Sequence, residues 1–158
     1  MSSTAVFQRV LVPVDFSECS RAALHKAAKL TRRTGGTIDV IHAWRLPAFV
    51  PPESVVGTVG AAGEPLVDLM QANAEAAMRK LVESARSEGI EITDARILLG
   101  NPAAVIVEQA GSGGYDLIVL GTHGRSGLSH ALIGSVAERV VRLSPVPVLT
   151  VRHAELEA

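Results

Sequence analysis

Short runs of β-branched residues alternate with alanine-rich segments of helical spacing, and this alternation most constrains the fold. The apolar runs predict strands buried on both faces, and they cover residues 10–14, 37–43, 92–99, 115–120 and 146–151. The segments between them predict helices over residues 18–34, 65–88, 102–111 and 135–143. Strict alternation favours right-handed crossovers. We therefore expect one α/β domain over residues 1–158, with a five-stranded parallel sheet and helices on both faces.

Composition agrees with this architecture and excludes several functions. Of the 158 residues, 47% are hydrophobic but only 3% aromatic, so the core must consist of Ala, Val, Leu and Ile. The net charge of −1 offers no basic excess for a nucleic-acid partner. The single cysteine allows no internal disulfide. We find no signal-peptide pattern and no apolar run near the ~18 residues that span a membrane, which predicts a cytoplasmic protein without membrane contact.

Capping residues mark several of the expected boundaries. Ser17 precedes a helix as a candidate N-cap, and Gly35 follows that helix. Asn101 followed by Pro102 has the form of an N-cap with proline at the first helical position. Pro147 cannot donate to a strand ladder, so the last strand is expected at a sheet edge or beside a bulge.

The middle of the chain is less regular. Residues 44–64 are rich in proline and glycine and show no clear periodicity, which is typical of a functional cover or a mobile segment. The helix that follows is expected to bury one apolar face, made of Leu66, Leu69, Met70, Ala77, Leu81 and Ala85.

Two strand ends carry unusual chemistry, and ligands of open parallel sheets bind beyond such carboxyl ends. Asp15 follows the first strand, while Gly121 and Gly124 flank a turn after the fourth. Gly134-Ser135 stands at the next helix start, where free N–H groups favour an anion. The segment has no GK[ST] motif and is not a Walker loop. It predicts a phosphate site, and the alternative is an ordinary loop punctuated by glycines.

Individual residues of this region allow two interpretations each. Asp15 either caps the adjacent helix or contacts a ribose or a metal on the phosphates. His123 either touches phosphate or packs at the rim, and Arg125 either reaches phosphate or is solvated. Cys19 near a helix start is either a favoured thiolate or, more simply, a buried packing residue.

These residues also carry a resemblance. VLVPVDFSECS resembles the opening of the universal stress proteins, and GTHGRSGLSHALIGSVAERVVRLSPVPVLTVR resembles their closing third. Gly121 and Gly124, nine residues, then Gly134-Ser135 is the spacing of the ATP-binding members. The resemblance covers nearly the whole chain, with the termini and residues 44–64 departing most. It implies the strand order 3-2-1-4-5, which puts strands one and four side by side.

The resemblance also implies a ligand and a set of contacts. The ligand would be ATP, with Mg²⁺ on its phosphates and possible help from Asp15. The adenosine end would be lined by Pro13, Val14, Asp15 and Ala43. Ribose and phosphates would be held by Leu120, Gly121, His123, Gly124, Arg125, Gly134, Ser135 and Val136. A homodimer is expected through the last strand, from Val146 to Val151, because exposed strand edges pair readily.

Three functions remain open at the level of sequence. The first is an ATP-binding module of stress response or signalling, with at most slow ATP hydrolysis. The second is an ATPase or phosphotransferase completed by a partner, although no catalytic residues are evident and the five histidines are scattered. The third is a dimeric adaptor that needs no nucleotide.

Overall fold

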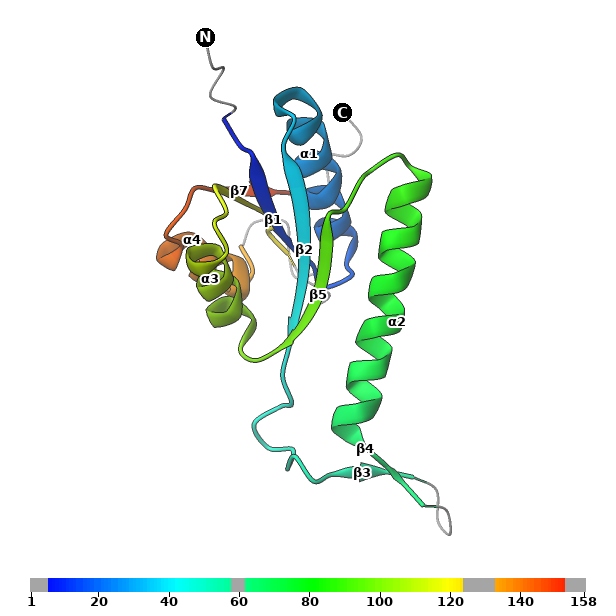
Figure 1. Cartoon of the computed structure of the whole chain (residues 1–158). Helices are drawn as coiled ribbons and strands as arrows, with labels where there is room; N and C mark the ends of the chain where they lie inside the picture. The colour runs from blue at the N-terminus through cyan, green and yellow to red at the C-terminus, as the bar shows by residue number, and fades with distance from the viewer. Residues whose placement is uncertain (1–5, 58–61, 124–132, 153–158) are drawn as a thin grey trace.

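Five parallel strands form the central sheet in the order β5-β2-β1-β6-β7, shown in Figure 1. The structure is a computed structural model and describes residues 6–57, 62–123 and 133–152. Numbered along the chain, these strands have the order 3-2-1-4-5, so the predicted topology is confirmed. Their bounds differ from the predicted ones by at most two residues and are β1 (Arg9–Pro13), β2 (Thr37–Trp44), β5 (Asp94–Leu99), β6 (Leu117–Gly121) and β7 (Val148–Val151).

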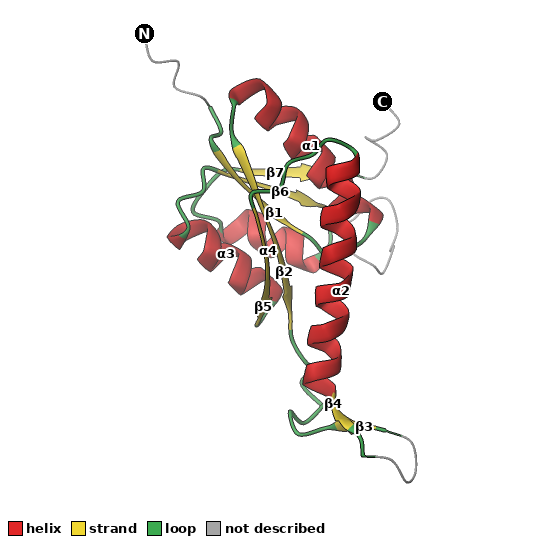
Figure 2. Ribbon diagram, turned by 45° about the vertical axis from the view of Figure 1, so that its right-hand side comes forward, coloured by secondary structure: helices red, strands yellow, loops and turns green. Residues whose placement is uncertain are grey.

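Helices cover both faces of the sheet, as Figure 2 shows. Side chains alternate between the faces of a strand, so Val10 and Val12 of β1 pack in one core cluster and Leu11 in the other. The first cluster lies under α1 and α2, the second under α3 and α4. The helices are α1 (Glu18–Thr34), α2 (Leu66–Ser87), α3 (Pro102–Ser112) and α4 (Ser135–Leu143).

The predicted caps are present. The Ser17 side chain accepts the N–H of Ser20 at the start of α1, and Gly35 ends that helix with a left-handed φ of 71°. The Asn101 side chain accepts the N–H of Ala104, with Pro102 as the first residue of α3. The last strand lies at a sheet edge, as expected, and the carbonyl of Pro147 just before it accepts the N–H of Ile118.

The predicted buried face of α2 is wrong in its first half. The buried residues are Ala74, Met78, Leu81 and Ala85, while Leu66, Leu69, Met70 and Ala77 are only half-buried. Figure 1 shows the reason, because the first turns of α2 extend beyond the lower end of the sheet. Apolar spacing predicted the helix correctly, but it could not tell where the sheet beneath it ends.

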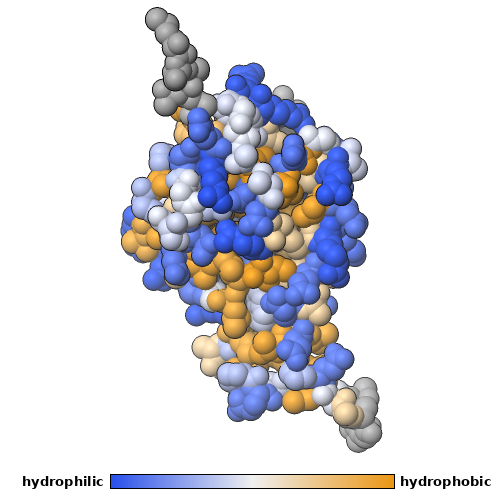
Figure 3. Space-filling model, viewed as in Figure 1, coloured by the Kyte–Doolittle hydropathy of each residue, from blue (hydrophilic) through white to orange (hydrophobic). Residues whose placement is uncertain are grey.

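The proline- and glycine-rich segment contains a small hairpin that its lack of periodicity did not predict. Strands β3 (Val55–Val56) and β4 (Glu64–Pro65) pair in antiparallel fashion below the main sheet. Val55 and Val56 are exposed, as is Phe49 before them. Figure 3 shows apolar surface gathered on the lower part of this face of the molecule.

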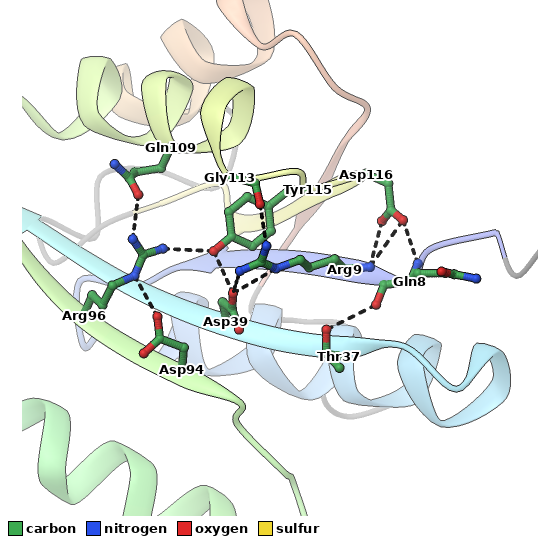
Figure 4. A network of polar contacts seen from close by, with 10 residues as sticks. All are labelled: Gln8, Arg9, Thr37, Asp39, Asp94, Arg96, Gln109, Gly113, Tyr115 and Asp116. Carbon is green, nitrogen blue, oxygen red and sulfur yellow. Dashed lines mark hydrogen bonds and ion pairs between the residues drawn. The ribbon is translucent and has the colours of Figure 1, made fainter.

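A polar network, drawn in Figure 4, joins the strands near their amino ends. Asp39 of β2 is buried, and its carboxylate accepts from Arg9 Nη2 at 2.8 Å and from the Tyr115 hydroxyl at 2.7 Å. Arg96 of β5 donates to Tyr115 at 2.9 Å and to Gln109 at 2.7 Å. The network therefore connects three strands with the α3–β6 connection.

The ionisation of two network members is shifted. The hydrogen bond to Asp39 raises the pKa of Arg9 above its ordinary value. Burial raises the pKa of the Tyr115 phenol, and its hydrogen bond to Asp39 raises that pKa further. The Arg9 guanidinium also lies 4.6 Å from the centre of the Tyr115 ring, which adds a cation–π contact.

Candidate functional site

A cavity of about 290 Å³ opens at the opposite end of the sheet, beyond the carboxyl ends of β1 and β6. From β1 the chain first adds β2 and β5 on one side, and it then crosses to the other side of β1 to add β6 and β7. The strand order therefore reverses between β1 and β6. Ten of the twelve predicted site residues line this one cavity. They are Pro13, Val14, Asp15, Ala43, Leu120, Gly121, His123, Gly134, Ser135 and Val136. The other two, Gly124 and Arg125, lie outside the described residues.

The turn between β1 and α1 carries the acidic side of the cavity. Asp15 Oδ1 accepts the N–H of Ser17 at 3.0 Å and also the Ser17 hydroxyl. Phe16 between them has a positive φ of 64°, an uncommon conformation for a bulky residue. Asp15 therefore holds Ser17, the N-cap of α1, and does not itself cap the helix through these two bonds. Its interpretation as a ribose or metal contact stays a prediction.

His42 supports this turn from β2. Its Nδ1 lies 2.7 Å from the Val14 carbonyl oxygen, and because a carbonyl can only accept, Nδ1 must carry the hydrogen. The imidazole ring also packs against Phe16, with 4.5 Å between ring centres. These two contacts hold the residues on either side of Asp15.

The opposite wall is built around the end of β6. The Thr122 N–H donates to the Val151 carbonyl at 3.0 Å, which ties this wall to the end of β7. The Thr122 carbonyl accepts the N–H of Gly134 at 2.6 Å, which places the start of α4 against the cavity. Gly134 is the N-cap of α4 and offers no side chain to cap it. Among the described residues no side chain caps α4, and its first N–H groups are suited to an anionic group.

Gly121 allows β6 and α1 to approach closely here. A Cβ at Gly121 would lie 2.8 Å from the Cys19 carbonyl carbon and 3.0 Å from its Sγ. Cys19 itself is buried, and its thiol donates to the Val151 carbonyl at 3.2 Å. The packing interpretation of Cys19 is thus confirmed.

His123 follows directly after the buried Thr122. Its Nδ1 lies 2.9 Å from Thr122 Oγ1, while Nε2 is buried without a hydrogen-bond partner in the described part of the chain. Because His123 also lines the cavity, the structure places an unsatisfied ring nitrogen at the predicted phosphate side.

Sequence reasoning missed the apolar wall of the cavity. Ile41 of β2 and Pro102 and Ile106 of α3 line it, together with Ser20, Thr122 and Ala137. The parity of β2 would have identified Ile41, since it lies two residues before Ala43 and so on the same face. No sequence signal reveals how close α3 comes to that face.

Among the residues that the structure describes, acidic and metal-binding groups are few at this end of the molecule. Asp15 is the one carboxylate among the described residues that line the cavity. Within residues 6–57, 62–123 and 133–152, no three His, Cys, Asp or Glu side chains are grouped to hold a metal ion. In the same ranges, no helix has the length and hydropathy of a membrane span.

Comparison with known proteins gives consistent matches over almost the whole chain. A universal stress protein of Methanocaldococcus jannaschii is 31% identical over 154 residues, which are 96% of this chain and 86% of the relative. One of Bacillus subtilis is 32% identical over 150 residues, 93% of this chain and 100% of the relative. Both relatives therefore match the whole domain rather than a single motif.

Solved structures share the fold at lower identity. A universal stress protein in complex with cAMP superposes with a TM-score of 0.67 at 24% identity, over 94% of this chain and 98% of the other. One from Archaeoglobus fulgidus in complex with dAMP gives 0.63 at 24%, over 92% and 98%. The family model described as "Universal stress protein family" matches residues 7–152. The chain therefore belongs to the universal stress protein family.

Proposed function

We propose that this protein binds ATP or a related adenine nucleotide in the cavity at the carboxyl ends of β1 and β6. One observation carries the proposal. Ten residues from separate parts of the sequence, which the family resemblance implies as nucleotide contacts, surround one cavity of about 290 Å³. Ligand pockets commonly combine an apolar wall with a few convergent polar groups, and this cavity has both.

The two ends of the cavity suit different parts of a nucleotide. Ile41, Pro102 and Ile106 supply apolar surface for a base, beside the backbone of Ala43. Asp15 stands where a ribose hydroxyl could donate to its carboxylate. The uncapped start of α4 and Gly121 allow phosphate oxygens to approach backbone N–H groups.

Magnesium would arrive on the phosphates of the nucleotide. Asp15 is the one carboxylate of the described cavity lining, and one of its oxygens is already bonded to Ser17. Mg²⁺ in phosphate sites is ordinarily held by one or two carboxylates together with substrate phosphates and water. The described residues therefore suit an Mg²⁺ held by the nucleotide phosphates, and Asp15 is the described carboxylate that could help to hold it.

The proposed role is that of a nucleotide-dependent module in stress response or signalling, located in the cytoplasm, with at most slow hydrolysis. Two proteins of the same fold are known in complex with cAMP and with dAMP, which supports an adenine nucleotide. The proposed homodimer would pair the edge strand β7 with its copy, since one side of that strand faces no other strand of the described sheet.

The first test is to denature freshly purified protein and to identify any released nucleotide by chromatography and mass spectrometry. The stripped protein is then titrated with ATP and Mg²⁺ by calorimetry. Released or tightly bound adenine nucleotide is the expected result. Absence of both would leave the fold intact and favour a nucleotide-independent dimeric adaptor, whereas rapid turnover would favour an ATPase or phosphotransferase completed by a partner.

A ligand contact of Asp15 can be separated from its hydrogen bonds to Ser17. In Asp15→Asn the side-chain oxygen can still accept from Ser17, but the negative charge is lost. If Asp15 contacts ribose, this variant should bind ATP more weakly while its affinity for inorganic triphosphate is unchanged or rises. Equal losses for both ligands would contradict a ribose contact.

A further inference from the structure

The imidazole of His42 takes the place of a backbone donor where β1 ends. Beyond Pro13, the Val14 N–H still donates to the Ile41 carbonyl at 2.8 Å. With Pro13 and Ile41 as register partners, the next bond of a parallel ladder would run from the Ala43 N–H to the Val14 carbonyl. That carbonyl instead accepts the Nδ1–H of His42 at 2.7 Å. The side chain of β2 thus occupies the acceptor that its own backbone would use.

The backbone of Ala43 is directed towards the cavity. On the outer side of β2, the Trp44 carbonyl accepts the N–H of Gly100 at 2.8 Å, and the Ile38 carbonyl accepts the N–H of Thr93 at 2.8 Å. Successive residues of a strand direct their backbone groups to opposite sides, so Ala43 directs its N–H and its C=O to the β1 side. The cavity, which Ala43 lines, opens there beyond the end of β1. Within the described part of the chain, neither of these two groups forms a hydrogen bond.

The turn after β1 carries the chain away from Ala43. In a longer ladder the Phe16 N–H would donate to the Ala43 carbonyl. Phe16 instead has a positive φ of 64°, and its ring packs on the His42 ring with 4.5 Å between ring centres. His42 therefore contacts both Val14 and Phe16, the two residues that an extended β1 would use to pair with Ala43.

The N–H and C=O of one residue form a donor–acceptor pair that matches the edge of a base. Adenine carries an amino group, which donates, beside ring nitrogens that accept. Ile41, Pro102 and Ile106 supply apolar surface to the same cavity. A base packed on this surface could therefore receive the Ala43 N–H at a ring nitrogen and donate its amino group to the Ala43 carbonyl.

We propose that His42 is a positioning residue that keeps the Ala43 N–H open to the base of a bound nucleotide, because its imidazole occupies the Val14 carbonyl. This inference rests on the nucleotide site proposed above and deepens it. Without the imidazole, the Val14 carbonyl accepts the Ala43 N–H, the β1–β2 ladder gains one bond, and the base loses its donor. His42 is not among the residues that line the cavity, so it acts through Val14.

Amide hydrogen exchange of Ala43, followed by NMR in the ligand-free protein, tests the effect on the backbone. His42→Leu keeps an apolar side chain against Phe16 but has no donor. In this variant the Ala43 amide should exchange about tenfold more slowly than in the wild type, because it has gained a ladder bond. His42→Asn supplies an amide donor for the Val14 carbonyl and should restore the faster exchange. The Ile41 amide, which lies within the strand, is the internal reference.

Calorimetric titration with AMP, 1-deaza-AMP and 7-deaza-AMP tests the effect on the ligand. Each analogue lacks one of the ring nitrogens beside the amino group. The wild type should bind one of them about three- to tenfold more weakly than AMP, because the Ala43 N–H then has no acceptor. In His42→Leu, AMP should weaken by the same factor and lose its advantage over that analogue. His42→Asn should retain the preference of the wild type.

His25→Leu is the matched control, because it removes an imidazole that pairs with Glu88 at 3.0 Å and does not line the cavity. It should change neither the exchange of Ala43 nor the preference for AMP. If His42→Leu leaves the exchange of Ala43 unchanged, or weakens AMP and both analogues equally, the inference is wrong while nucleotide binding stands. A wild type that binds AMP and both analogues equally well would also overturn it. If the wild type binds neither AMP nor ATP, the proposed function fails and the base contact with it, whereas the exchange of Ala43 still shows whether His42 prevents the ladder bond.

Discussion

At the scale of single residues, one buried carboxylate organises the end of the sheet opposite the cavity. Asp39 is almost fully buried, and it is compensated by a guanidinium and a phenol rather than by solvent. Removing one partner leaves a buried charge without compensation, and this costs more stability than the intact pair contributes. The sequence TIDVIHA predicted a buried strand but gave no sign that its aspartate is buried as well.

Tyr115 makes this network sensitive to alkaline pH. Burial raises the pKa of its phenol, so the folded state holds this proton more tightly than the unfolded state does. The contribution of Tyr115 to the free energy of unfolding is fully present below the phenol pKa of the unfolded state, about 10. It is lost as the pH rises through the higher pKa of the folded state. We expect the free energy of unfolding, measured with urea from pH 8 to pH 11, to decline above pH 10.

Tyr115→Phe is the matched variant, since this is the one tyrosine of the chain. At pH 8 it should be less stable than the wild type by about 1–3 kcal/mol, because Asp39 and Arg96 lose a partner. Above pH 10 the difference between the two proteins should shrink. A difference that stays constant up to pH 11 would contradict the assignment.

Gly121 offers a second test, at the close approach of β6 and α1. The new Cβ of Gly121→Ala would lie within 3.0 Å of the Cys19 carbonyl group, so the strand end must move away from α1. We expect a loss of about 1–3 kcal/mol of stability and weaker nucleotide binding. Gly111→Ala is the control, because its Cβ would meet only Pro145 at 3.5 Å. Equal stability of the two variants would refute the steric argument.

At the scale of elements, sequence signals predicted the helix caps and the edge strand correctly. They did not predict how distant elements pack against one another. Ser17, Gly35 and Asn101 act through neighbours only a few residues away, so their roles can be derived from the local sequence. The strand ends that carry Asp15 and Gly121 could be predicted to meet once the strand order was known. The buried face of α2 and the apolar wall from α3 depend on how far distant elements overlap, which periodicity does not encode.

The edge strand β7 carries the prediction for self-association. On its outer side no strand of the described sheet pairs with it, whereas the Val151 carbonyl points inward to the Thr122 N–H. Since successive residues of a strand direct their N–H groups to opposite sides, the N–H of Thr150 points outward. Thr150→Pro should therefore remove a donor from the dimer edge while leaving the β6–β7 ladder intact.

Sedimentation velocity over a range of concentrations measures the outcome for this variant. We expect a dimer for the wild type, and a shift towards monomer for Thr150→Pro with unchanged circular dichroism. A variant that remains a dimer of equal strength would show that the copies associate through another surface.

At the scale of the whole molecule, rigidity and binding are placed at opposite ends of one sheet. The amino ends of the strands are joined by the Asp39 network, whereas the carboxyl ends leave a cavity whose polar atoms are only partly satisfied. A ligand that fills the cavity therefore adds contacts at the carboxyl ends of the strands, where polar atoms lack partners among the described residues. Binding to the folded state alone stabilises the whole protein.

This arrangement predicts a clear thermal shift. Adenine nucleotide at about a hundred times its Kd should stabilise the fold by about 2.7 kcal/mol. For a chain of this size, about 2–4 °C per kcal/mol corresponds to a rise in Tm of about 5–11 °C. Differential scanning calorimetry of the stripped protein with AMP or ATP measures it, and sulfate at equal ionic strength is the control. Because Tyr115→Phe alters the far end of the sheet, it should lower the starting Tm yet keep the same nucleotide-induced rise. A rise that disappeared in this variant would mean that the two ends of the sheet are coupled, and that the cavity depends on the network.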